Sequence, residues 1–304
     1  MTKCPATARV TGQINWLQDT FMTQSSSVTR TGFIGLGNIG KPMAIQLAKS
    51  EFPTVVYDIN PKACEELVSQ GATTASSPAE LASQCHYIGI CVRDDADTFN
   101  VLTGENGILA TAKPGTIVAV HSTVKIDTIR KLAEIAAGKN VTVFDAPITG
   151  GAHGAASKQL YYMCGGDEAV IQQVEKYMMT SAQKVVFAGE LGSGMKLKLC
   201  NNLMTYIELM ALHEGMKLAR ASGLNLDVLK EVTTGNGVLT PNMKMVFDTK
   251  RGFDEKTFAE IMTGFKAVAI KDLSSALDLA DTLDISLPGT GTCREAMKQV
   301  FGIG

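Results

Sequence analysis

The chain has 304 residues, of which 45% are hydrophobic and 19% charged, and its formal net charge is −2. This composition is that of a globular protein, and the length allows two domains of ordinary size. A nearly neutral chain without a long basic run gives no electrostatic reason to expect nucleic acid or an anionic membrane as a partner. No apolar stretch approaches the roughly 18–20 residues that a membrane span needs. We therefore expect a soluble protein.

Cysteine and histidine spacing argues against disulfides and metal sites. The seven cysteines are scattered, odd in number and include no C-x-x-C pair. This pattern suits reduced thiols in the cytoplasm, where most of them would act as small core hydrophobes. The four histidines show no metal-ligand spacing, so we expect no bound metal.

Residues 1–30 differ in character from the rest of the chain. They are rich in Ser and Thr, carry three basic residues against one acid, and show no sustained hydrophobic period. An organellar transit peptide is one interpretation, but such peptides usually carry more Arg and a clearer amphipathic face. We expect a poorly ordered N-terminal extension, with Met22 as an alternative start.

From Thr31 onward, short β-rich runs alternate with helical patterns. The expected strands are Gly32–Leu36, Thr54–Asp58, Tyr87–Val92, Thr116–His121 and Val141–Ala146. The expected helices are Ile39–Lys49, Pro61–Gln70, Pro78–Gln84 and Ile126–Ala137. Two further strands, Gln159–Cys164 and Lys184–Ala188, flank an expected helix near Glu168–Met178 and extend the sheet. Such alternation predicts a parallel sheet with helices on both faces.

The pattern changes after Gly194. Apolar residues recur at helical spacing through Met195–Ser222, which predicts a helix of about 28 residues, roughly 42 Å long, that Gly223 would end. The rest of the chain suggests further helices, broken at Gly235–Gly237, Gly252 and Pro288–Gly289. We expect a Rossmann-type doubly wound α/β domain over residues 31–193 and an all-helical domain over residues 194–304, joined by the long helix.

A glycine-rich segment links the first expected strand to the first expected helix. It consists of Gly35, Leu36, Gly37, Asn38, Ile39 and Gly40, a G-x-G-x-x-G pattern. The first glycine permits a tight turn, the second lets the backbone approach a pyrophosphate, and the third lets the helix pack close to the strand. The helix N-terminus offers N–H groups to the phosphates. We predict that all six residues bind a dinucleotide.

Asp58 strengthens this prediction, because it ends the second expected strand 18 residues after the last glycine. An acid at this place accepts hydrogen bonds from a ribose 2′-OH and repels a 2′-phosphate. Ile59 follows, with no Arg that could hold such a phosphate. We therefore expect NAD as the cofactor, with NADP less favoured. Val92 and Arg93, at the end of a later strand, complete the expected cofactor contacts.

Several distinct motifs lie between Gly32 and Ala280. They are Phe33–Ala44, Asp145–Gly151 with Gly154-Ala155, Gly192-Ser193-Gly194 with Lys198 and Asn201-Asn202, Lys271-Asp272-Leu273, and the loop His121-Ser122-Thr123. Together they resemble the β-hydroxyacid dehydrogenases, the family of 3-hydroxyisobutyrate dehydrogenase and of tartronate, glyoxylate and succinic semialdehyde reductases. The sequence departs from the family pattern at Ile39, Thr149 and Lys158, where Met or Gln, Ser and Gly are usual, and it stops at Gly304, where relatives usually continue.

The resemblance implies a catalytic pair on the long helix. Lys198 is expected to transfer the hydroxyl proton of the substrate, while the cofactor accepts or donates the hydride. Asn202 lies four residues further on and therefore shares the same helix face. Lys196 points about 200° away from Lys198, and we assign it to solvent.

The resemblance also implies the substrate contacts. Thr149, Gly150 and Gly151 would present a hydroxyl and backbone N–H groups to a substrate carboxylate. Thr123 would contact both the cofactor and the substrate. Lys271 would reach across from the helical domain and close the site over the nicotinamide or the carboxylate.

We thus expect an NAD-dependent oxidoreductase, a homodimer or homotetramer, that interconverts a small 3-hydroxy acid and its semialdehyde. The alternatives are an NADPH-dependent glyoxylate or succinic semialdehyde reductase, and a non-catalytic dinucleotide-binding relative, against which Lys198 and Asn202 argue. An imine reductase typically carries Asp or Tyr at the lysine position, and a 6-phosphogluconate dehydrogenase needs a larger helical domain. The substrate and the physiological direction stay open.

Overall fold

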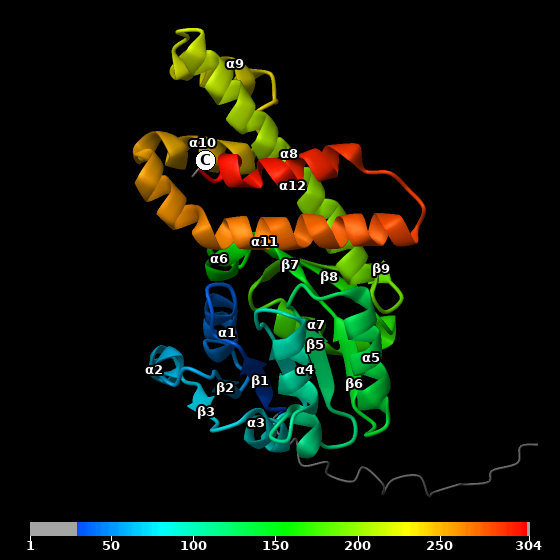
Figure 1. The fold of residues 1–304 in the computed structure, drawn as a ribbon. Helices are drawn as coiled ribbons and strands as arrows, with labels where there is room; N and C mark the ends of the chain where they lie inside the picture. The colour runs from blue at the N-terminus through cyan, green and yellow to red at the C-terminus, as the bar shows by residue number, and fades with distance from the viewer. Residues whose placement is uncertain (1–28, 303–304) are drawn as a thin grey trace, which may run out of the picture.

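The computed structural model describes residues 29–302 and consists of an α/β part and a helical part (Figure 1). The expected N-terminal extension at 1–30 lies outside the described residues, apart from its last two positions. Helix α8 (Ser193–Ala221) begins beside the sheet and runs out into the helical part. The architecture is a Rossmann-type domain joined by a long helix to an all-helical domain, as the sequence predicts.

Within residues 29–302, the α/β domain is built on a nine-stranded sheet with the order β3-β2-β1-β4-β5-β6-β8-β7, in which β9 also pairs with β8. The strands are β1 (Thr31–Ile34), β2 (Thr54–Tyr57), β3 (Thr73–Thr74), β4 (Tyr87–Ile90), β5 (Ile117–Val120), β6 (Thr142–Asp145), β7 (Ile148–Thr149), β8 (Leu160–Gly165) and β9 (Ala182–Gly189). Strands β1 to β6 are parallel throughout. Their carboxyl ends therefore meet at one edge, where the glycine-rich segment also lies.

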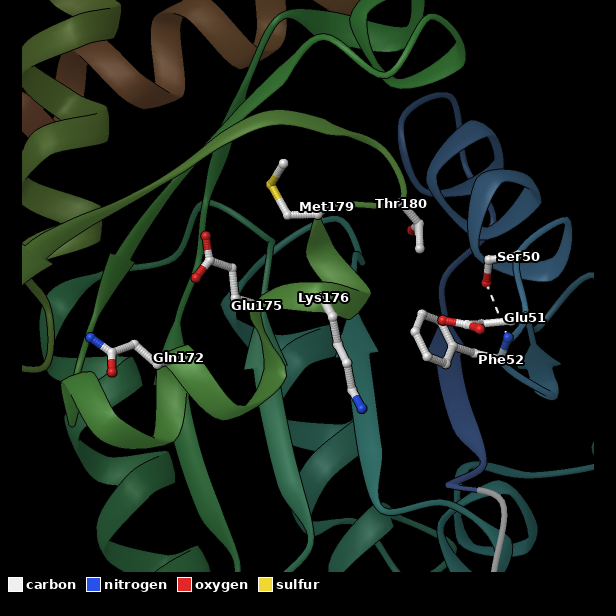
Figure 2. A pocket seen from close by; sticks show the side chains of 8 residues that line it. All are labelled: Ser50, Glu51, Phe52, Gln172, Glu175, Lys176, Met179 and Thr180. Atoms are coloured by element: carbon white, nitrogen blue, oxygen red, sulfur yellow. Dashed lines mark hydrogen bonds between the residues drawn. The ribbon is translucent and has the colours of Figure 1, made fainter. Parts of the chain in front are cut away.

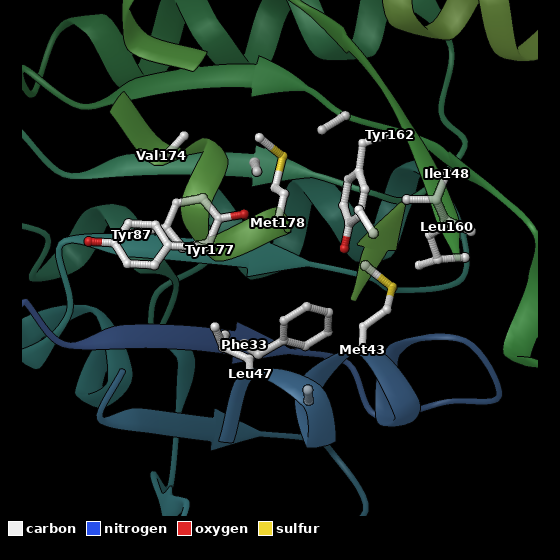
Figure 3. Close-up of a cluster of buried hydrophobic side chains, with 14 of the residues drawn as sticks. Phe33, Met43, Leu47, Tyr87, Ile148, Leu160, Tyr162, Val174, Tyr177 and Met178 are labelled. Atoms are coloured by element: carbon white, nitrogen blue, oxygen red, sulfur yellow. The ribbon is translucent and has the colours of Figure 1, made fainter. Parts of the chain in front are cut away.

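Helices cover both faces of this sheet. They are α1 (Gly40–Ala48), α2 (Lys62–Ser69), α3 (Pro78–Gln84), α4 (Asp95–Thr103), α5 (Ile126–Ala137), α6 (Gly151–Ala156) and α7 (Glu168–Met178), with a short 3₁₀ turn at Ile108–Ala110. Strand residues alternate between the two cores: Phe33 and Val56 pack with α1 and α7, whereas Ile34 and Val55 pack with α3, α4 and α5. Figure 3 shows the first of these cores. This two-sided burial is the reason that the strands are almost continuously apolar.

The sheet is not parallel at its far end, which the strand–helix alternation did not indicate. Strand β8 runs antiparallel to both β6 and β7, and only its partner β9 is parallel to it. The chain between β7 and β8 holds only the six-residue helix α6. A parallel crossover needs a dozen or more residues, so this short connection returns the chain antiparallel.

Several short elements were not predicted from the sequence. They are β3, β7, α4, α6 and the 3₁₀ turn. Helix α4 is the longest of them, and it did carry a signal. Asp94 caps its N-terminus by accepting a hydrogen bond from the Asp97 backbone N–H at 2.9 Å, as an acidic N-cap residue does.

The helical domain packs four helices against α8. They are α9 (Leu226–Gly235), α10 (Pro241–Gly252), α11 (Glu255–Thr282) and α12 (Pro288–Val300). Leu209, Phe247, Leu273 and Met297 contribute to a core of their own. Helix α11 lies across the top of the α/β domain in Figure 1, so residues on its lower side face the carboxyl edge of the sheet.

The described residues contain neither a helix long and apolar enough to cross a membrane nor a cluster of three side chains that could hold a metal ion. The cysteines that the structure describes are all free thiols.

Lys158, where the family pattern usually has Gly, adopts a backbone conformation that we expect to lower stability. It follows the C-cap of α6 with a φ of 60°, a left-handed conformation in which glycine is usual. The side chain is exposed, so glycine would cost no packing. Lys158→Gly should raise the free energy of unfolding by about 0.5–1 kcal/mol, because it relieves the left-handed strain. Urea unfolding checks this, with Ser157→Gly as the matched control at φ −95°, where no gain is expected.

Candidate active site

The glycine-rich segment forms an open cradle at the end of β1. Gly35 has a φ of 94°, and a Cβ on it would lie 2.2 Å from the carbonyl oxygen of Cys91. A Cβ on Gly40 would lie 2.0 Å from the carbonyl oxygen of Gly35, so α1 packs against β1 only because this residue is glycine. Around Gly37, by contrast, a Cβ would meet no atom of the described chain within 4 Å. The cradle therefore has room for a phosphate group directly above its second glycine, as a dinucleotide site requires.

Asp58 lies beside this cradle at the end of β2. Its Oδ2 accepts a hydrogen bond from the Leu36 backbone N–H at 2.7 Å, and its Oδ1 accepts one from the Asn60 backbone N–H at 2.8 Å. The carboxylate is thus fixed against the turn that would hold the pyrophosphate. Each carboxylate oxygen can accept a further hydrogen bond, so the ribose diol of a dinucleotide could still bind here.

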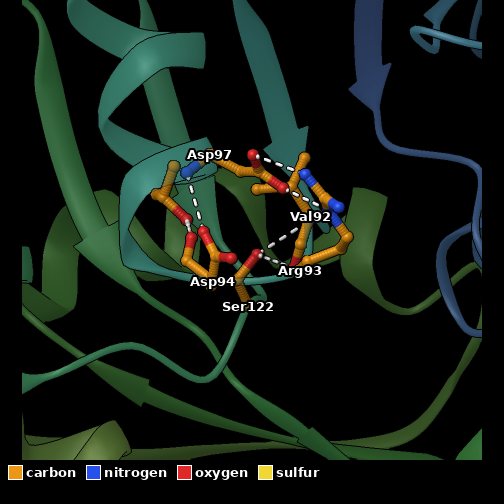
Figure 4. A network of polar contacts seen from close by, with 6 residues as sticks. Val92, Arg93, Asp94, Asp97 and Ser122 are labelled. Atoms are coloured by element: carbon orange, nitrogen blue, oxygen red, sulfur yellow. Dashed lines mark hydrogen bonds and ion pairs between the residues drawn. The ribbon is translucent and has the colours of Figure 1, made fainter. Parts of the chain in front are cut away.

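The ends of β4 and β5 are tied together next to the cradle. The Ser122 hydroxyl accepts from the Val92 N–H at 2.8 Å and donates to the Val92 carbonyl at 2.9 Å (Figure 4). Arg93 extends into solvent and makes two hydrogen bonds, 2.6 and 3.0 Å long, with the carboxylate of Asp97. Val92 is therefore fixed at the carboxyl edge, whereas the Arg93 guanidinium is engaged by Asp97 of the following helix α4.

Thr123 and Lys271 connect the two domains over this edge. The Lys271 ammonium donates to the Thr123 carbonyl oxygen at 2.7 Å, across 148 residues of sequence. The neighbouring His121 lies beneath, stacked on Phe33, with its Nδ1 2.9 Å from the Ala146 carbonyl oxygen. Burial lowers the pKa of His121 to about 4, so the imidazole is neutral and supports the loop from below.

Asp145, at the end of β6, anchors the start of the long helix. Its buried carboxylate accepts hydrogen bonds from the backbone N–H groups of Gly192 at 2.7 Å and Met195 at 2.8 Å. A negative charge is favourable at a helix N-terminus. Burial nevertheless raises the pKa of Asp145 to about 6, against the effect of these N–H groups. Since Lys198 follows Met195 by one helical turn, Asp145 fixes where that lysine points.

Lys198 lies between the sheet and α11, with its side chain partly buried. Its Nζ donates to the Ile148 carbonyl oxygen at 2.7 Å. Burial lowers the pKa of Lys198 to about 8; the Asp272 carboxylate opposes this lowering and the Lys271 ammonium adds to it. A lysine with such a pKa can exchange a proton near neutral pH, which an ordinary surface lysine does poorly. Lys196 lies 3.9 Å from Glu190 and is partly exposed.

Asn202 is buried one turn further along α8, in a hydrogen-bonded chain of side chains. Its Nδ2 donates to Asp272 Oδ2 at 2.7 Å, and its Oδ1 accepts from Asn201 at 3.0 Å. Asn201 also lies 3.4 Å from the Thr149 hydroxyl. Both ends of the Asn202 amide are therefore engaged within the protein, and one hydrogen of Nδ2 is left for a substrate.

Gly150 and Gly151 form the turn into α6 directly after Thr149. Their φ values are 119° and 64°, so both adopt backbone conformations that favour glycine. A Cβ on Gly151 would meet no atom of the described chain within 4 Å. The turn thus leaves open space at Gly151, three residues after the carbonyl that holds Lys198, where a small anion could meet backbone N–H groups.

The structure brings most of the predicted site residues to one edge of the sheet. The cradle and Asp58 lie at β1 and β2, Val92 and Thr123 follow β4 and β5, and Lys198 lies over β7. Sequence reasoning did not give roles to Asp145, Asp272 or His121. Asp145 and Asp272 did lie within the quoted motifs, and the presence of an acid in such a motif could have indicated a functional role for each.

An open hollow lies elsewhere and is not a candidate for this chemistry. Figure 2 shows it between the segment that precedes β2 and helix α7, where Phe52, Lys176 and Thr180 line it. These residues precede β2 and β9 and so lie at the amino ends of strands. Ligands of open α/β sheets bind at the carboxyl ends.

Comparison with known families matches nearly the whole described chain. Residues 30–189 match the NAD binding domain of 6-phosphogluconate dehydrogenase, and residues 192–302 match the family described as NAD-binding of NADP-dependent 3-hydroxyisobutyrate dehydrogenase. An uncharacterized oxidoreductase of Mycobacterium tuberculosis is 34% identical over 270 residues, which cover 88% of this chain and 91% of that protein. The mitochondrial 3-hydroxyisobutyrate dehydrogenase of Mus musculus is 34% identical over 207 residues, 68% of this chain and 62% of its own length.

Solved structures agree with this assignment. The 3-hydroxyisobutyrate dehydrogenase of Salmonella typhimurium is similar with a TM-score of 0.77 and 26% identity, covering 88% of this chain and 93% of that one. That of Mycobacterium tuberculosis, determined with L-serine, has a TM-score of 0.75 and 25% identity over 89% of this chain and 92% of its own. The chain therefore belongs to the β-hydroxyacid dehydrogenase family and is a 3-hydroxyisobutyrate dehydrogenase-like, NAD(P)-binding oxidoreductase that acts on a CH–OH group.

Proposed function

We propose that this oxidoreductase uses NAD to interconvert a small 3-hydroxy acid and its semialdehyde, with Lys198 as the proton-transfer group. The observation that carries the proposal is the position of the Lys198 Nζ, which is bonded at 2.7 Å to the carbonyl of Ile148, the residue before Thr149. A proton-transfer group and an anion-binding turn are thereby adjacent. Residues 31–193 would hold the cofactor, and residues 194–304 would complete the site.

The chemistry follows from these positions. NAD, when bound, accepts the hydride from the alcohol carbon. Lys198 takes the hydroxyl proton as the carbonyl forms, and returns it in the reverse reaction. The remaining N–H of Asn202 would hold the reacting oxygen on the side opposite to Lys198, while Thr149, Gly150 and Gly151 bind the carboxylate. Thr123 and Lys271 would close the site between cofactor and substrate.

Relatives support this substrate class. The structure from Mycobacterium tuberculosis was obtained with L-serine, which is itself a small 3-hydroxy acid with a free carboxylate. The mouse protein is named for 3-hydroxyisobutyrate. Both ligands place the hydroxyl two carbons from the carboxylate, which matches a lysine next to an anion-binding turn.

The proposal can be tested by measuring NADH formation from 3-hydroxyisobutyrate, 3-hydroxypropionate and L-serine, and NADH consumption with the corresponding semialdehydes. We expect at least one of these acids to be oxidised. If the purified, folded protein turns over none of these compounds with either NAD or NADP, the proposed reaction is wrong.

Asp58 should determine the choice of cofactor. A ribose diol can donate to its carboxylate, whereas a 2′-phosphate would be repelled by it. We expect a higher kcat/KM with NAD than with NADP, and Asp58→Ser combined with Ile59→Arg should shift the ratio toward NADP. Steady-state kinetics with both cofactors measures this ratio. A wild-type enzyme that uses NADP as well as NAD would contradict the role given to Asp58 and favour the NADPH-dependent reductase, which the description of the matched C-terminal family also supports.

We also propose that the protein forms a homodimer or homotetramer in the cytoplasm. Exposed apolar side chains gather at the outer end of α8 and on α9, namely Leu218, Leu224, Val228 and Val232, each more than half exposed. Figure 1 shows this end of the helical domain extending away from the rest of the molecule. An apolar patch of this kind favours association between copies.

A further inference from the structure

Asp272 is a buried carboxylate whose charge is only partly compensated by hydrogen bonds. It is 2% exposed and lies on the side of α11 that faces α8. Its Oδ2 accepts from Asn202 Nδ2 at 2.7 Å and from the Tyr206 hydroxyl at 3.5 Å. No group of the described residues donates a hydrogen bond to Oδ1, which lies 3.3 Å from the Lys271 ammonium. A buried carboxylate without full pairing is costly, so its retention calls for a reason.

Two ammonium groups are influenced by this carboxylate: Lys271, 3.3 Å from Oδ1, and Lys198, one helical turn before the Asn202 that Asp272 binds. Lys271 is held by the Thr123 carbonyl and is partly exposed, so solvent screens its charge. Lys198 is also partly buried, and the Asp272 charge opposes the lowering of its pKa by burial. The two charges of α11 therefore act on Lys198 in opposite directions.

We propose that Asp272 is a positioning residue for hydride transfer: its carboxylate supplies the charge that stabilises the ammonium form of Lys198 and fixes the amide of Asn202 beside it. This inference rests on the proposed role of Lys198. Asp272 does not touch the substrate in this arrangement, and it acts through the two side chains that do.

The chemistry gives Asp272 a part in both directions of the reaction. When an alcohol is oxidised, Lys198 gains a proton, and the nearby carboxylate stabilises the ammonium that forms. When a semialdehyde is reduced, Lys198 must begin protonated, and the same carboxylate keeps it so despite burial and the charge of Lys271. By accepting from Nδ2, Asp272 also determines which end of the Asn202 amide faces the substrate.

The pH dependence of kcat/KM for alcohol oxidation tests the proposal. In the wild-type enzyme, activity should rise with pH as Lys198 loses its proton, with a midpoint near its pKa of about 8. Asp272→Asn removes the stabilising charge and should move this limb to lower pH by about one unit or more. Lys271→Met removes the opposing charge and should move it to higher pH, by less because Lys271 is partly exposed. A purely structural role for these residues would not produce shifts of opposite sign.

Two further variants keep the test valid even if Asp272→Asn alone fails to fold. The double variant, Lys271→Met with Asp272→Asn, removes both charges of α11, so the Lys271 ammonium is not left without its carboxylate partner. Relative to Lys271→Met alone, the limb of this double variant should lie about one unit lower in pH. Tyr206→Phe removes the weak 3.5 Å hydrogen bond but no charge, and its limb should coincide with that of the wild type. The other titratable group beside Tyr206 is the Cys293 thiol, whose pKa burial raises to about 11, so it does not titrate in this range.

The outcomes separate cleanly. A lower midpoint on loss of Asp272, in either background, supports the proposal, and an unmoved midpoint in a folded, active protein overturns it. The proposed function has a separate failure, namely full activity after loss of Lys198, which would show itself whatever the midpoints of the Asp272 variants. Circular dichroism and thermal unfolding confirm that each variant is folded before its profile is used.

Discussion

Replacing Lys198 by alanine should lower kcat by at least about 10²-fold, the lower end of the range for general acid–base catalysis. The Nζ of Lys198 is placed next to the turn proposed to bind the carboxylate, at 2.7 Å from the Ile148 carbonyl, and burial brings its pKa to about 8. Water can replace this group in the cavity that alanine leaves, but only as a weaker and less well oriented base.

The same substitution should hardly change the affinity for NAD. The cradle at Gly35–Gly40 and Asp58 lie on β1 and β2, whereas Lys198 lies on α8 over β7. The affinity of the variant for NAD, measured by titration calorimetry, therefore separates a catalytic defect from a folding defect. Lys196→Ala is the matched control, because Lys196 lies on the same turn of α8 and is partly exposed near Glu190. Near-normal kcat in a folded Lys198→Ala protein would contradict the assignment.

Most of the fold could be predicted from sequence, since the patterns that define it are local. Helices α3, α5 and α7 have the predicted ends, and the five predicted strands of the parallel part differ by at most two residues at either end. The long helix begins at Ser193, two residues before its predicted start. These elements have strong periods or clear caps, and nothing in tertiary packing overrides them.

The far end of the sheet could not be predicted in the same way. Strand β7 has two residues and α6 has six, too few to show a period. The direction of β8 depends on how little chain separates it from β7, which a list of strand-like runs does not reveal. Element lengths determine this topology more than residue types do.

The site residues also divide into those that a local sequence pattern predicts and those that depend on the folded structure. The glycine cradle is a contiguous segment with a physical reason for each glycine, and it could be recognised directly. Lys198 could be singled out only through its resemblance to a family, because a lysine early in a helix usually lies in solvent. Asp145 and Asp272 lay within the quoted motifs, but their partners could not be predicted from sequence: Asp145 meets Gly192 across 47 residues, and Asp272 meets Asn202 across 70. Such pairs form only once the chain has folded, the first where β6 meets the start of α8 and the second where α11 packs on α8.

Simple alcohols should be far poorer substrates than 3-hydroxy acids, with kcat/KM lower by about 10³-fold or more. Thr149, Gly150 and Gly151 form a turn that directly follows Ile148, whose carbonyl holds Lys198, and the chain leaves open space at Gly151. A carboxylate bound there acts at a distance from the reacting carbon, and its binding energy aligns that carbon with the cofactor. A site built to bind a polar group also rejects an analogue that lacks it, because its own groups stay unpaired.

The comparison requires kcat/KM for 3-hydroxypropionate, 3-hydroxyisobutyrate, L-serine, 4-hydroxybutyrate and propanol at one pH. Lengthening the acid by one carbon should cost less than removing the carboxylate, since the space between the two domains can adjust more easily than a missing charge can be replaced. Thr149→Val keeps the size of the side chain but removes its hydroxyl, so it should lower kcat/KM for the acids and leave the low value for propanol unchanged. The alcohol thus serves as an internal control for general damage to the site. Comparable values for propanol and the acids would remove the carboxylate role of this turn, and with it the hydroxy acid as substrate class.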